Sequence, residues 1–522
     1  MEIAGKRGGA GGVESIDLPD EAATVAFAAW AAGFARRGDF LALAGDLGAG
    51  KTTFARAFLR AALDDPELEA PSPTFTLMQV YEGPEFPVVH ADFYRLRSAE
   101  ELAQLGWDEI VDGAVTLVEW PSHAAEALPP DRLEIEFAFD LARGADYRRA
   151  AVRAHGALSA RYARARGIER LLQRAGWAEA RRDDLQGDAS ARAYQRLTAS
   201  DARTAILMIS PPRPGGPILR YGKTYAAIAK LSPDIRAFLA MAEGLRALGY
   251  SSPRVFAHSV ADGLALIEDF GAETIADERG ADPARYAEAT ALLADLHGRA
   301  PPHELSVDGE SYALPIYDVE AMLVEVELAL DWYAPAVARI NPPTGARMQF
   351  LGLWRDVLAP VLAQPTTWTL RDYHSPNLHW LDDRVGLQRL GLIDFQDAVL
   401  GPPAYDLASL LQDARVEIPD DLELRLLALY ARRRADADAA FDAEAFAASY
   451  AVMGAQRATK ILGLFARLDK RDGKPQYLRH LPRLERRLAR DLAHPLLEPL
   501  RLWYQAHLPR ALGGAVESPS EP

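Results

Sequence analysis

A glycine-rich segment near the N-terminus has the residue types that bind a polyphosphate. Residues 45–52 fit the pattern G-x-x-x-x-G-K-T, between an apolar run at 40–44 and a helix-like stretch at 52–62. In this pattern the glycines turn backbone amides toward phosphates, the lysine reaches the outer phosphates, and the threonine ligates Mg²⁺. The predicted nucleotide contacts are Gly45, Gly48, Gly50, Lys51 and Thr52. The segment predicts an ATP-binding P-loop rather than a chance glycine-rich turn.

Hydrolysis of ATP also needs carboxylates near the metal ion and the attacking water. Asp92 and Glu119 each follow a strand-like run, at 87–90 and 115–118. Because parallel strands place ligands at their carboxyl ends, we expect these two acids near the P-loop. A solvated acid at a strand end is the plainer alternative.

A second set of acidic and amide side chains occurs much later in the chain. Asp372 precedes Asn377 by five residues, and an apolar strand at 391–393 ends in Asp394. In phosphoryl transfer such an aspartate orients the attacking hydroxyl, while an asparagine and a second aspartate hold Mg²⁺. The order and spacing therefore predict a phosphotransferase site. The Asp-Phe-Gly at 269–271 precedes this pair, so we assign it to the strand that links two lobes.

The elements around these motifs predict two domains of different fold. Residues 14–157 alternate strand and helix signals, which indicates an α/β P-loop domain with a mostly parallel sheet and flanking helices. Residues 158–512 predict an α+β bilobal kinase-like domain with a large helical C-lobe. We expect a disordered leader at 1–13 and a disordered tail at 513–522. The Ala- and Arg-rich stretch 143–182 predicts a linker and an amphipathic helix.

Composition and charge restrict the function classes. The 522 residues include no cysteine and carry a net charge of −16, of which residues 1–155 contribute −12 from 14 Lys and Arg against 26 Asp and Glu. Disulfides and thiolate zinc sites are excluded, and a cytoplasmic protein is favoured. Neither half shows a strongly basic surface, so strong direct binding of nucleic acid is not expected. The longest apolar run, 22–35, is short for a membrane span.

The N-terminal motifs resemble those of TsaE, the ATPase subunit of the bacterial machinery that makes threonylcarbamoyladenosine in tRNA. The resembling segments, in order, are 45–53, 72–77, 92–96 and 117–121. The resemblance implies that Thr53 also handles phosphate, that Asp92 and Glu119 serve the metal and the water, and that Thr74 lies in a switch-like loop. It also implies partners of the TsaB and TsaD type.

The C-terminal motifs resemble the aminoglycoside-phosphotransferase superfamily. Segments 370–378 and 393–397 look most like AmgK-like anomeric kinases of N-acetylmuramate and N-acetylglucosamine, enzymes of cell-wall recycling. Segment 187–192 matches the family's nucleotide-covering turn, which implies that Ser190 and Arg192 approach the phosphates. Gln456, Arg457 and Lys460 fall in late helices where this superfamily forms its acceptor pocket, although helix-surface charges are usually solvated.

Two departures from the superfamily pattern leave alternatives open. Leu370 replaces the usual histidine, and the strand 205–209 lacks the lysine that clamps the phosphates. The basic residues that could replace this lysine are Arg192, Arg213 and Lys223. We therefore expect a bifunctional ATPase and amino-sugar kinase that uses ATP and Mg²⁺. The alternatives are a regulatory protein with a degenerate kinase domain, or a kinase for an amino alcohol or an aminoglycoside.

Overall fold

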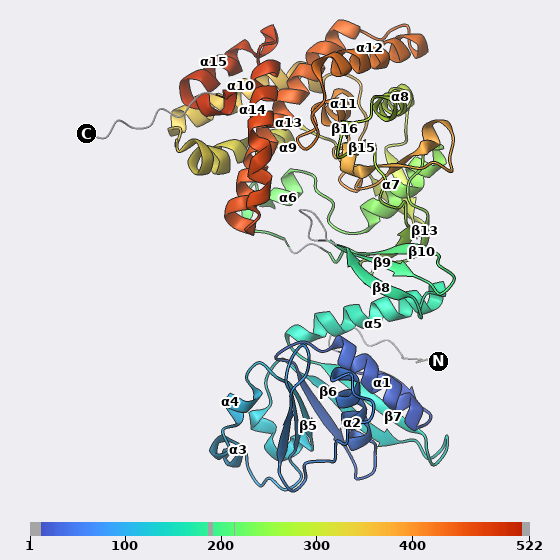
Figure 1. Cartoon of the computed structure of the whole chain (residues 1–522). Coiled ribbons are helices and arrows are strands. Elements are labelled where there is room, and N and C mark those ends of the chain that lie inside the picture. The colour runs from blue at the N-terminus through green and yellow to red at the C-terminus, as the bar shows by residue number, and fades with distance from the viewer. Residues whose placement is uncertain (1–11, 186–191, 213–214, 514–522) are drawn as a thin grey trace, which may run out of the picture. The chain divides into compact units, whose positions relative to one another are not determined.

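The computed structural model describes residues 12–185, 192–212 and 215–513. The chain divides into two compact units, Met1–Arg170 and Leu171–Pro522, and the division falls inside helix α5 (Ala157–Ala175) (Figure 1). The expected leader and tail lie largely outside the described residues. Among the helices of the described residues, none is both long and apolar enough to cross a bilayer.

The first unit is built on a seven-stranded sheet with the order β1-β7-β6-β2-β5-β4-β3. The neighbours β6, β2, β5 and β4 run parallel, whereas β1, β7 and β3 pair antiparallel at the two edges. The strands are β1 (Glu14–Leu18), β2 (Phe40–Gly45), β3 (Met78–Tyr81), β4 (Val88–Asp92), β5 (Val115–Glu119), β6 (Leu133–Phe139) and β7 (Arg148–Ala154). The expected α/β fold with a mostly parallel sheet is confirmed.

Alternating side chains of β2 bury both faces of this sheet. Leu41 and Leu43 pack in one apolar cluster with residues of α1 (Glu21–Phe34) and α2 (Lys51–Ala62). Phe40 and Ala42 point to the other face, where the cluster includes Leu102 and Trp107. These come from the short helices α3 (Glu100–Gln104) and α4 (Trp107–Val111). Helices on both faces of a parallel sheet leave its carboxyl edge open for ligands.

The Ala- and Arg-rich stretch forms more regular structure than the sequence suggested. Residues 148–154, expected to be linker, form β7, whose buried Ala150 and Val152 alternate with polar residues. The small apolar residues at period two were obscured by the arginines around them. The expected amphipathic helix is α5, and its Tyr162 hydroxyl donates to Glu14 Oε2 at 2.7 Å. The beginning of α5 therefore packs on the first unit.

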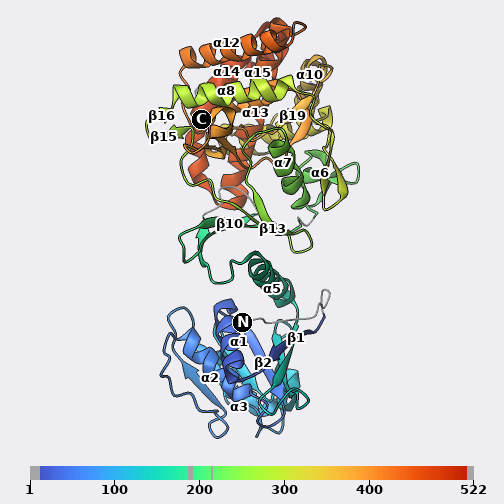
Figure 2. The ribbon, with the colours of Figure 1, turned by 90° about the vertical axis from the view of Figure 1, so that its right-hand side faces the viewer.

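The second unit begins with a five-stranded antiparallel sheet of order β13-β14-β10-β9-β8. Its strands are β8 (Arg181–Leu185), β9 (Ala193–Thr198), β10 (Thr204–Ile209), β13 (Val255–Ser259) and β14 (Leu264–Glu268). Helices make up most of the remaining chain and gather beyond the sheet (Figure 2). The main helices are α7 (Arg236–Ala247), α8 (Pro283–Gly298), α9 (Val319–Leu328), α10 (Thr344–Leu362), α11 (Ala404–Leu411), α12 (Asp420–Ala437), α13 (Ala443–Asp472), α14 (Leu481–Asp491) and α15 (Glu498–His507). This confirms the expected bilobal fold.

Two short strand pairs interrupt the helices and hold the predicted catalytic segment. β19 (Thr367–Thr369) pairs with β22 (Val399–Gly401), and β20 (Leu378–Trp380) pairs with β21 (Leu390–Leu392). Asp372 and Asn377 lie in the segment between β19 and β20, and Asp394 follows β21. The strand pairs therefore bring together residues that are up to 22 positions apart in the sequence.

Candidate active sites

The P-loop has the backbone conformation that its glycines permit. β2 ends at Gly45 and α2 begins at Lys51. Gly45, Gly48 and Gly50 have φ angles of 132°, 78° and 115°, a region that side-chain-bearing residues rarely adopt. A Cβ on Gly45 would also lie 2.3 Å from the carbonyl oxygen of Phe137. The loop therefore depends on glycine at this position for both conformation and space.

Lys51 is buried and bonds to its own loop. Its Nζ donates to the carbonyl oxygens of Gly45 at 2.7 Å and Asp46 at 2.9 Å, and lies 3.8 Å from the ring centroid of Trp120. Burial lowers the pKa of the Lys51 amine, and the nearby carboxylates of Glu119, Asp92 and Asp46 oppose that shift. The ammonium group is thus held at the mouth of the loop, where a phosphate would replace the carbonyl contacts.

Asp92 and Glu119 are the last residues of neighbouring parallel strands and stand side by side. The register pairs Asp92 of β4 with Glu119 of β5. Thr52 Oγ1 donates to Glu119 Oε2 at 2.8 Å, and His90 Nε2 lies 3.0 Å from Glu119 Oε1. The hydroxyl and the two carboxylates are hard oxygen ligands of the kind that Mg²⁺ prefers, so this edge of the sheet fits the ion.

The loop 71–77 adds two hydroxyl groups to the same cluster. Ser72 Oγ and Thr74 Oγ1 both donate to Asp92 Oδ2 at 2.7 Å. Thr53 follows Thr52 on the first turn of α2 and is half-buried. The structure therefore brings Lys51, Thr52 and both acids together, as the sequence predicted, and it places Thr74, which was expected in a switch-like loop, against Asp92. Ser72 belongs to one of the quoted motifs but had no predicted role.

The second site has an aspartate, an asparagine and a further aspartate within contact distance. Asn377 Nδ2 donates to the backbone oxygen of Asp372 at 2.9 Å and to Asp394 Oδ2 at 3.4 Å. Gln396 Nε2 donates to Asp394 Oδ1 at 2.6 Å. The Asn377 amide nitrogen thus faces the loop, and its oxygen is the atom left to ligate a metal. One amide and one carboxylate oxygen fit Mg²⁺.

The two aspartates have opposite pKa shifts. Burial favours the neutral form of Asp372, but electrostatic interactions with His374, Lys460 and Arg457 hold its pKa below the usual range. Burial raises the pKa of Asp394 to about 6, and the negative charge of Asp372 adds to this rise. Their side chains remain 36% and 37% exposed, which leaves both carboxylates accessible to a ligand. A cation between them would relieve the repulsion.

Buried acids on two helices anchor the backbone before Asp372. The backbone amides of Leu370 and Arg371 donate to Asp406 on α11 at 2.6 and 2.8 Å. The Arg371 guanidinium is buried and pairs with Glu325 on α9. The position of the superfamily's histidine is therefore filled by Leu370, a buried residue fixed through its backbone. Neither Asp406 nor Glu325 was predicted. Each lies in a helix that is far in the sequence from the segment it holds, and nothing in the local pattern links the two.

Of the expected substitutes for the strand lysine that the structure describes, Arg192 contacts this site. Its Nη1 lies 3.6 Å from Asp394 Oδ1, and its Nη2 donates to Ser232 Oγ at 3.1 Å. Lys223, another of the expected substitutes for the strand lysine, is exposed on β12 (Lys223–Thr224). Ser190 and Arg213, which were also predicted to approach the phosphates, lie outside the described residues.

The late helix α13 borders the same site. Lys460 Nζ lies 2.8 Å from Glu325 Oε1, and Gln456 Nε2 donates to Glu325 Oε2 at 3.1 Å. Arg457 Nη1 donates to the backbone oxygen of Arg371 at 3.4 Å. These side chains are therefore packed around the segment before Asp372, and are not the solvated helix charges that the sequence left as an alternative.

Comparison with known proteins gives a match to each half of the chain. The sequence model of the family "Threonylcarbamoyl adenosine biosynthesis protein TsaE" matches residues 18–147, and that of the "Phosphotransferase enzyme family" matches residues 183–447. An N-acetylmuramate/N-acetylglucosamine kinase of Caulobacter vibrioides is 37% identical over 352 residues, which cover 65% of this chain and 95% of the relative.

Two further proteins match the N-terminal half. The tRNA threonylcarbamoyladenosine biosynthesis protein TsaE of Rickettsia bellii is 37% identical over 118 residues, which cover 23% of this chain and 81% of the relative. Among solved structures, YdiB of Bacillus subtilis has 32% identity and a TM-score of 0.25, covering 30% of this chain and 97% of that chain.

The P-loop site and the Asp–Asn–Asp site define a protein with two ATP-using enzyme domains. The chain belongs to the TsaE family through its N-terminal part and to the phosphotransferase enzyme family through its C-terminal part. The fusion predicted from the motifs is confirmed: an ATPase-type domain is joined to an ATP-dependent phosphotransferase. A regulatory protein with a degenerate kinase domain is not favoured.

Proposed function

We propose that the C-terminal domain phosphorylates the anomeric hydroxyl of N-acetylmuramate and N-acetylglucosamine with ATP. The name of the Caulobacter relative and its 95% coverage support this acceptor class. The observation that carries the proposal is the pairing of an accessible, ionised Asp372 with Asn377 and Asp394 at one site. Such an arrangement suits transfer to a hydroxyl group.

Each residue of this site has a role in the proposed transfer. Asp372 orients the acceptor hydroxyl and takes its proton as the bond to phosphorus forms, because its lowered pKa keeps it ionised at neutral pH. Asn377 and Asp394 would hold Mg²⁺, which offsets the negative charge of the phosphates. Arg192 takes the place of the strand lysine and contacts the phosphates from the side of Asp394. For Ser190, which lies outside the described residues, a contact with the phosphates remains an expectation from the family resemblance alone.

The proposed kinase activity is tested on the full chain with a panel of acceptors. ATP and Mg²⁺ would be supplied with N-acetylmuramate, N-acetylglucosamine, choline, ethanolamine and kanamycin, and ADP release would be followed. We expect turnover with the two amino sugars, and turnover lower by roughly a hundredfold or more with an Asp372→Ala variant. Turnover with kanamycin or choline alone would reject the proposed acceptor class while leaving the phosphotransferase intact.

We also propose that the N-terminal domain is the ATPase subunit of tRNA threonylcarbamoyladenosine synthesis, with TsaB- and TsaD-type proteins as partners. Lys51 and the glycines Gly45, Gly48 and Gly50 bind the phosphates, together with Thr52 and Thr53. Thr52 and Glu119 would hold Mg²⁺, and Asp92 positions the attacking water together with Glu119. The contacts that support these roles are Thr52 to Glu119 and Thr74 to Asp92. Both activities need ATP, so we place the protein in the cytoplasm.

Reconstitution with the partners tests this second activity. The full chain would be mixed with TsaB- and TsaD-type proteins and unmodified tRNA, and ATP hydrolysis and formation of the modified nucleoside would be measured. We expect the partners to stimulate hydrolysis by the wild-type chain and not by a Lys51→Ala variant. Equal hydrolysis by both chains would reject the P-loop assignment.

A further inference from the structure

A cavity of about 320 Å³ borders the predicted catalytic segment of the kinase domain. Its lining residues are Pro376, Arg415, Gln476, Tyr477, Arg479 and His480. Pro376 belongs to the 3-10 turn Ser375–Asn377, so one wall of the cavity is the segment that carries Asp372 and Asn377. Another part of the wall is the turn Pro475–His480, which follows α13.

Basic residues gather around the cavity in a chain that is acidic overall. Arg415, Arg479 and His480 line it, and Arg483 lies close to His480. Burial lowers the pKa of His480, the positive charges of Arg479, Arg415 and Arg483 add to this effect, and the negative charge of Asp413 opposes it, so the arginines supply the positive charge of the cavity. Because like charges around one cavity repel each other, a negatively charged ligand is the partner that such a site favours. The net charge of the whole chain is −16, so this patch is a local exception.

One buried acid, Asp413, connects two segments that border the cavity. Asp413 Oδ2 accepts from the backbone nitrogen of Ser375 at 3.1 Å and from its hydroxyl at 2.9 Å. Asp413 Oδ1 accepts from the backbone nitrogen of Arg415 at 2.8 Å. Asp413 therefore joins the catalytic segment to the loop that carries Arg415, and an anion in the cavity would lie against both.

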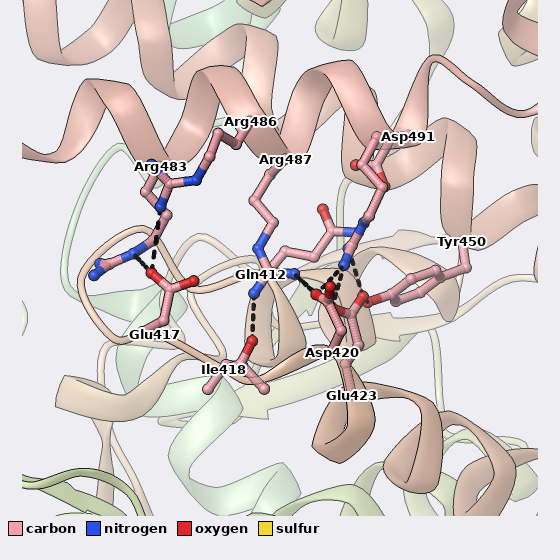
Figure 3. A network of polar contacts seen from close by, with 11 residues as sticks. Gln412, Glu417, Ile418, Asp420, Glu423, Tyr450, Arg483, Arg486, Arg487 and Asp491 are labelled. Carbon is pink, nitrogen blue, oxygen red and sulfur yellow. Dashed lines mark hydrogen bonds and ion pairs between the residues drawn. The ribbon is translucent and has the colours of Figure 1, made fainter. Parts of the chain in front are cut away.

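Arginines of α14 fix the loop 412–419 in place (Figure 3). Arg483 donates to Glu417 at 2.6 Å and to the backbone oxygen of Ala414 at 2.8 Å. Arg487 donates to the backbone oxygen of Ile418 at 2.6 Å, and Gln412 donates to Asp491 at 3.0 Å. Because this loop is fixed at both ends and in the middle, the backbone at Arg415 has little conformational freedom. A ligand that binds there therefore pays a smaller entropy cost.

The cavity is bordered by a residue close in sequence to the predicted catalytic aspartate. Pro376 is four residues from Asp372, so their Cα atoms are at most about 14 Å apart even in a fully extended chain. His374, between them, has its Nε2 4.0 Å from Asp372 Oδ1. An acceptor whose hydroxyl is at Asp372 could thus place a charged substituent in the cavity.

We infer that this cavity is a subsite for the carboxylate of an acidic amino sugar. Arg479 and Arg415 bind the carboxylate of N-acetylmuramate, while N-acetylglucosamine, which has no carboxylate, leaves the subsite empty. The inference rests on the proposed kinase activity. It adds a structural reason why the enzyme would distinguish N-acetylmuramate from N-acetylglucosamine. Charge-assisted hydrogen bonds of this kind are among the stronger polar contacts in proteins.

The test compares both acceptors in the full chain with Arg479→Ala. Arg479 is exposed, so its removal should not disturb folding. We expect kcat/KM for N-acetylmuramate to fall by about tenfold or more, and that for N-acetylglucosamine to change less than about twofold. Arg479→Lys should retain part of the preference because it keeps the charge. The matched control is Arg432→Ala, an exposed arginine on α12 that does not line the cavity.

The outcomes separate the subsite from the kinase activity itself. If the wild-type chain uses both sugars but Arg479→Ala changes neither, or lowers both equally, the carboxylate subsite is wrong and the kinase proposal stands. If the wild-type chain phosphorylates neither sugar, the kinase proposal fails and the subsite fails with it. Equal sensitivity of the Arg432→Ala control would show a general electrostatic effect and would also overturn the subsite.

Discussion

The carboxylate of Glu325 pairs with the guanidinium of Arg371, the residue immediately before Asp372. Both side chains are buried, and Lys460 Nζ lies 2.8 Å from the same carboxylate. Tyr317 donates to Glu325 as well, at 2.5 Å. Burial disfavours the charged form of Glu325, but Lys460 and Arg371 hold its pKa below the usual range. One acid of α9 therefore balances two cations beneath the catalytic segment.

Replacing Glu325 by glutamine should destabilise the kinase domain. The change keeps the shape but leaves Arg371 and Lys460 without their shared negative charge, and breaking a buried ion pair costs about 3–5 kcal/mol. Chemical denaturation of the full chain would measure the free energy of unfolding of this domain. The control is Glu320→Gln on the same helix, whose pair with Arg355 is at the surface and should contribute less than about 1 kcal/mol. Equal losses in the two variants would contradict the role of burial.

The two active sites should be separable by single substitutions. Lys51→Ala should abolish ATP hydrolysis with the TsaB- and TsaD-type partners and leave sugar phosphorylation unchanged, since each domain has its own core and site. Asp372→Ala should lower sugar phosphorylation by roughly a hundredfold or more with ATP still bound. Asp394→Ala should also weaken metal-dependent binding of ATP. Both activities would be measured in each full-length variant, and loss of both from one substitution would refute independence.

Arg192 should determine the affinity of the kinase domain for ATP. Its guanidinium lies beside Asp394, and we propose that it replaces the strand lysine. We expect Arg192→Ala to raise the KM for ATP by about tenfold, because a charged hydrogen bond contributes about 1.5–3 kcal/mol. Lys223→Ala, at an exposed position, serves as the control. A larger effect of Lys223→Ala would indicate that Lys223 on β12, and not Arg192, replaces the strand lysine.

Most of the site residues that could be predicted from the sequence lie close together within short motifs. Lys51 and Thr52 lie within one eight-residue pattern, and Asp372 lies five residues before Asn377. Asp92 and Glu119 are further apart, but each ends a strand, and the rule for parallel sheets places them together. Local pattern and a simple topological rule were therefore sufficient for these residues.

The residues that support the sites could not be predicted in the same way. Glu325, Asp406 and Asp413 lie in helices or near a helix end, and their partners in the catalytic segment are 35 to 46 residues away in the sequence. A pattern of helix periodicity does not show which acid will be buried against which backbone. The signal that was present is an acid inside an apolar run, as at Glu325 between Val324 and Val326. Such an acid needs a buried partner.

Asp491 should make the stability of the kinase domain depend on pH. It ends α14 beside Gln412, and burial raises its pKa to about 8, with Arg490 opposing and Glu423 adding to the rise. The native state therefore holds the proton more tightly than the unfolded chain. This carboxyl group should lower the free energy of unfolding as pH rises from about 4 to about 8, with no further change above that range.

Asp491→Asn should remove this dependence, because the amide is neutral at every pH. Relative to the wild-type chain, the variant should gain roughly 1–3 kcal/mol of unfolding free energy between pH 6 and pH 9. Urea denaturation of both chains at the two pH values measures the difference and cancels the other titrating groups. Asp421→Asn, at a 70% exposed position paired with Arg425, should show no such gain. The prediction is wrong if the difference in unfolding free energy between the variant and the wild-type chain is the same at pH 6 and at pH 9. Asp491 would then be ionised in the native state already at pH 6, and its pKa would not be raised.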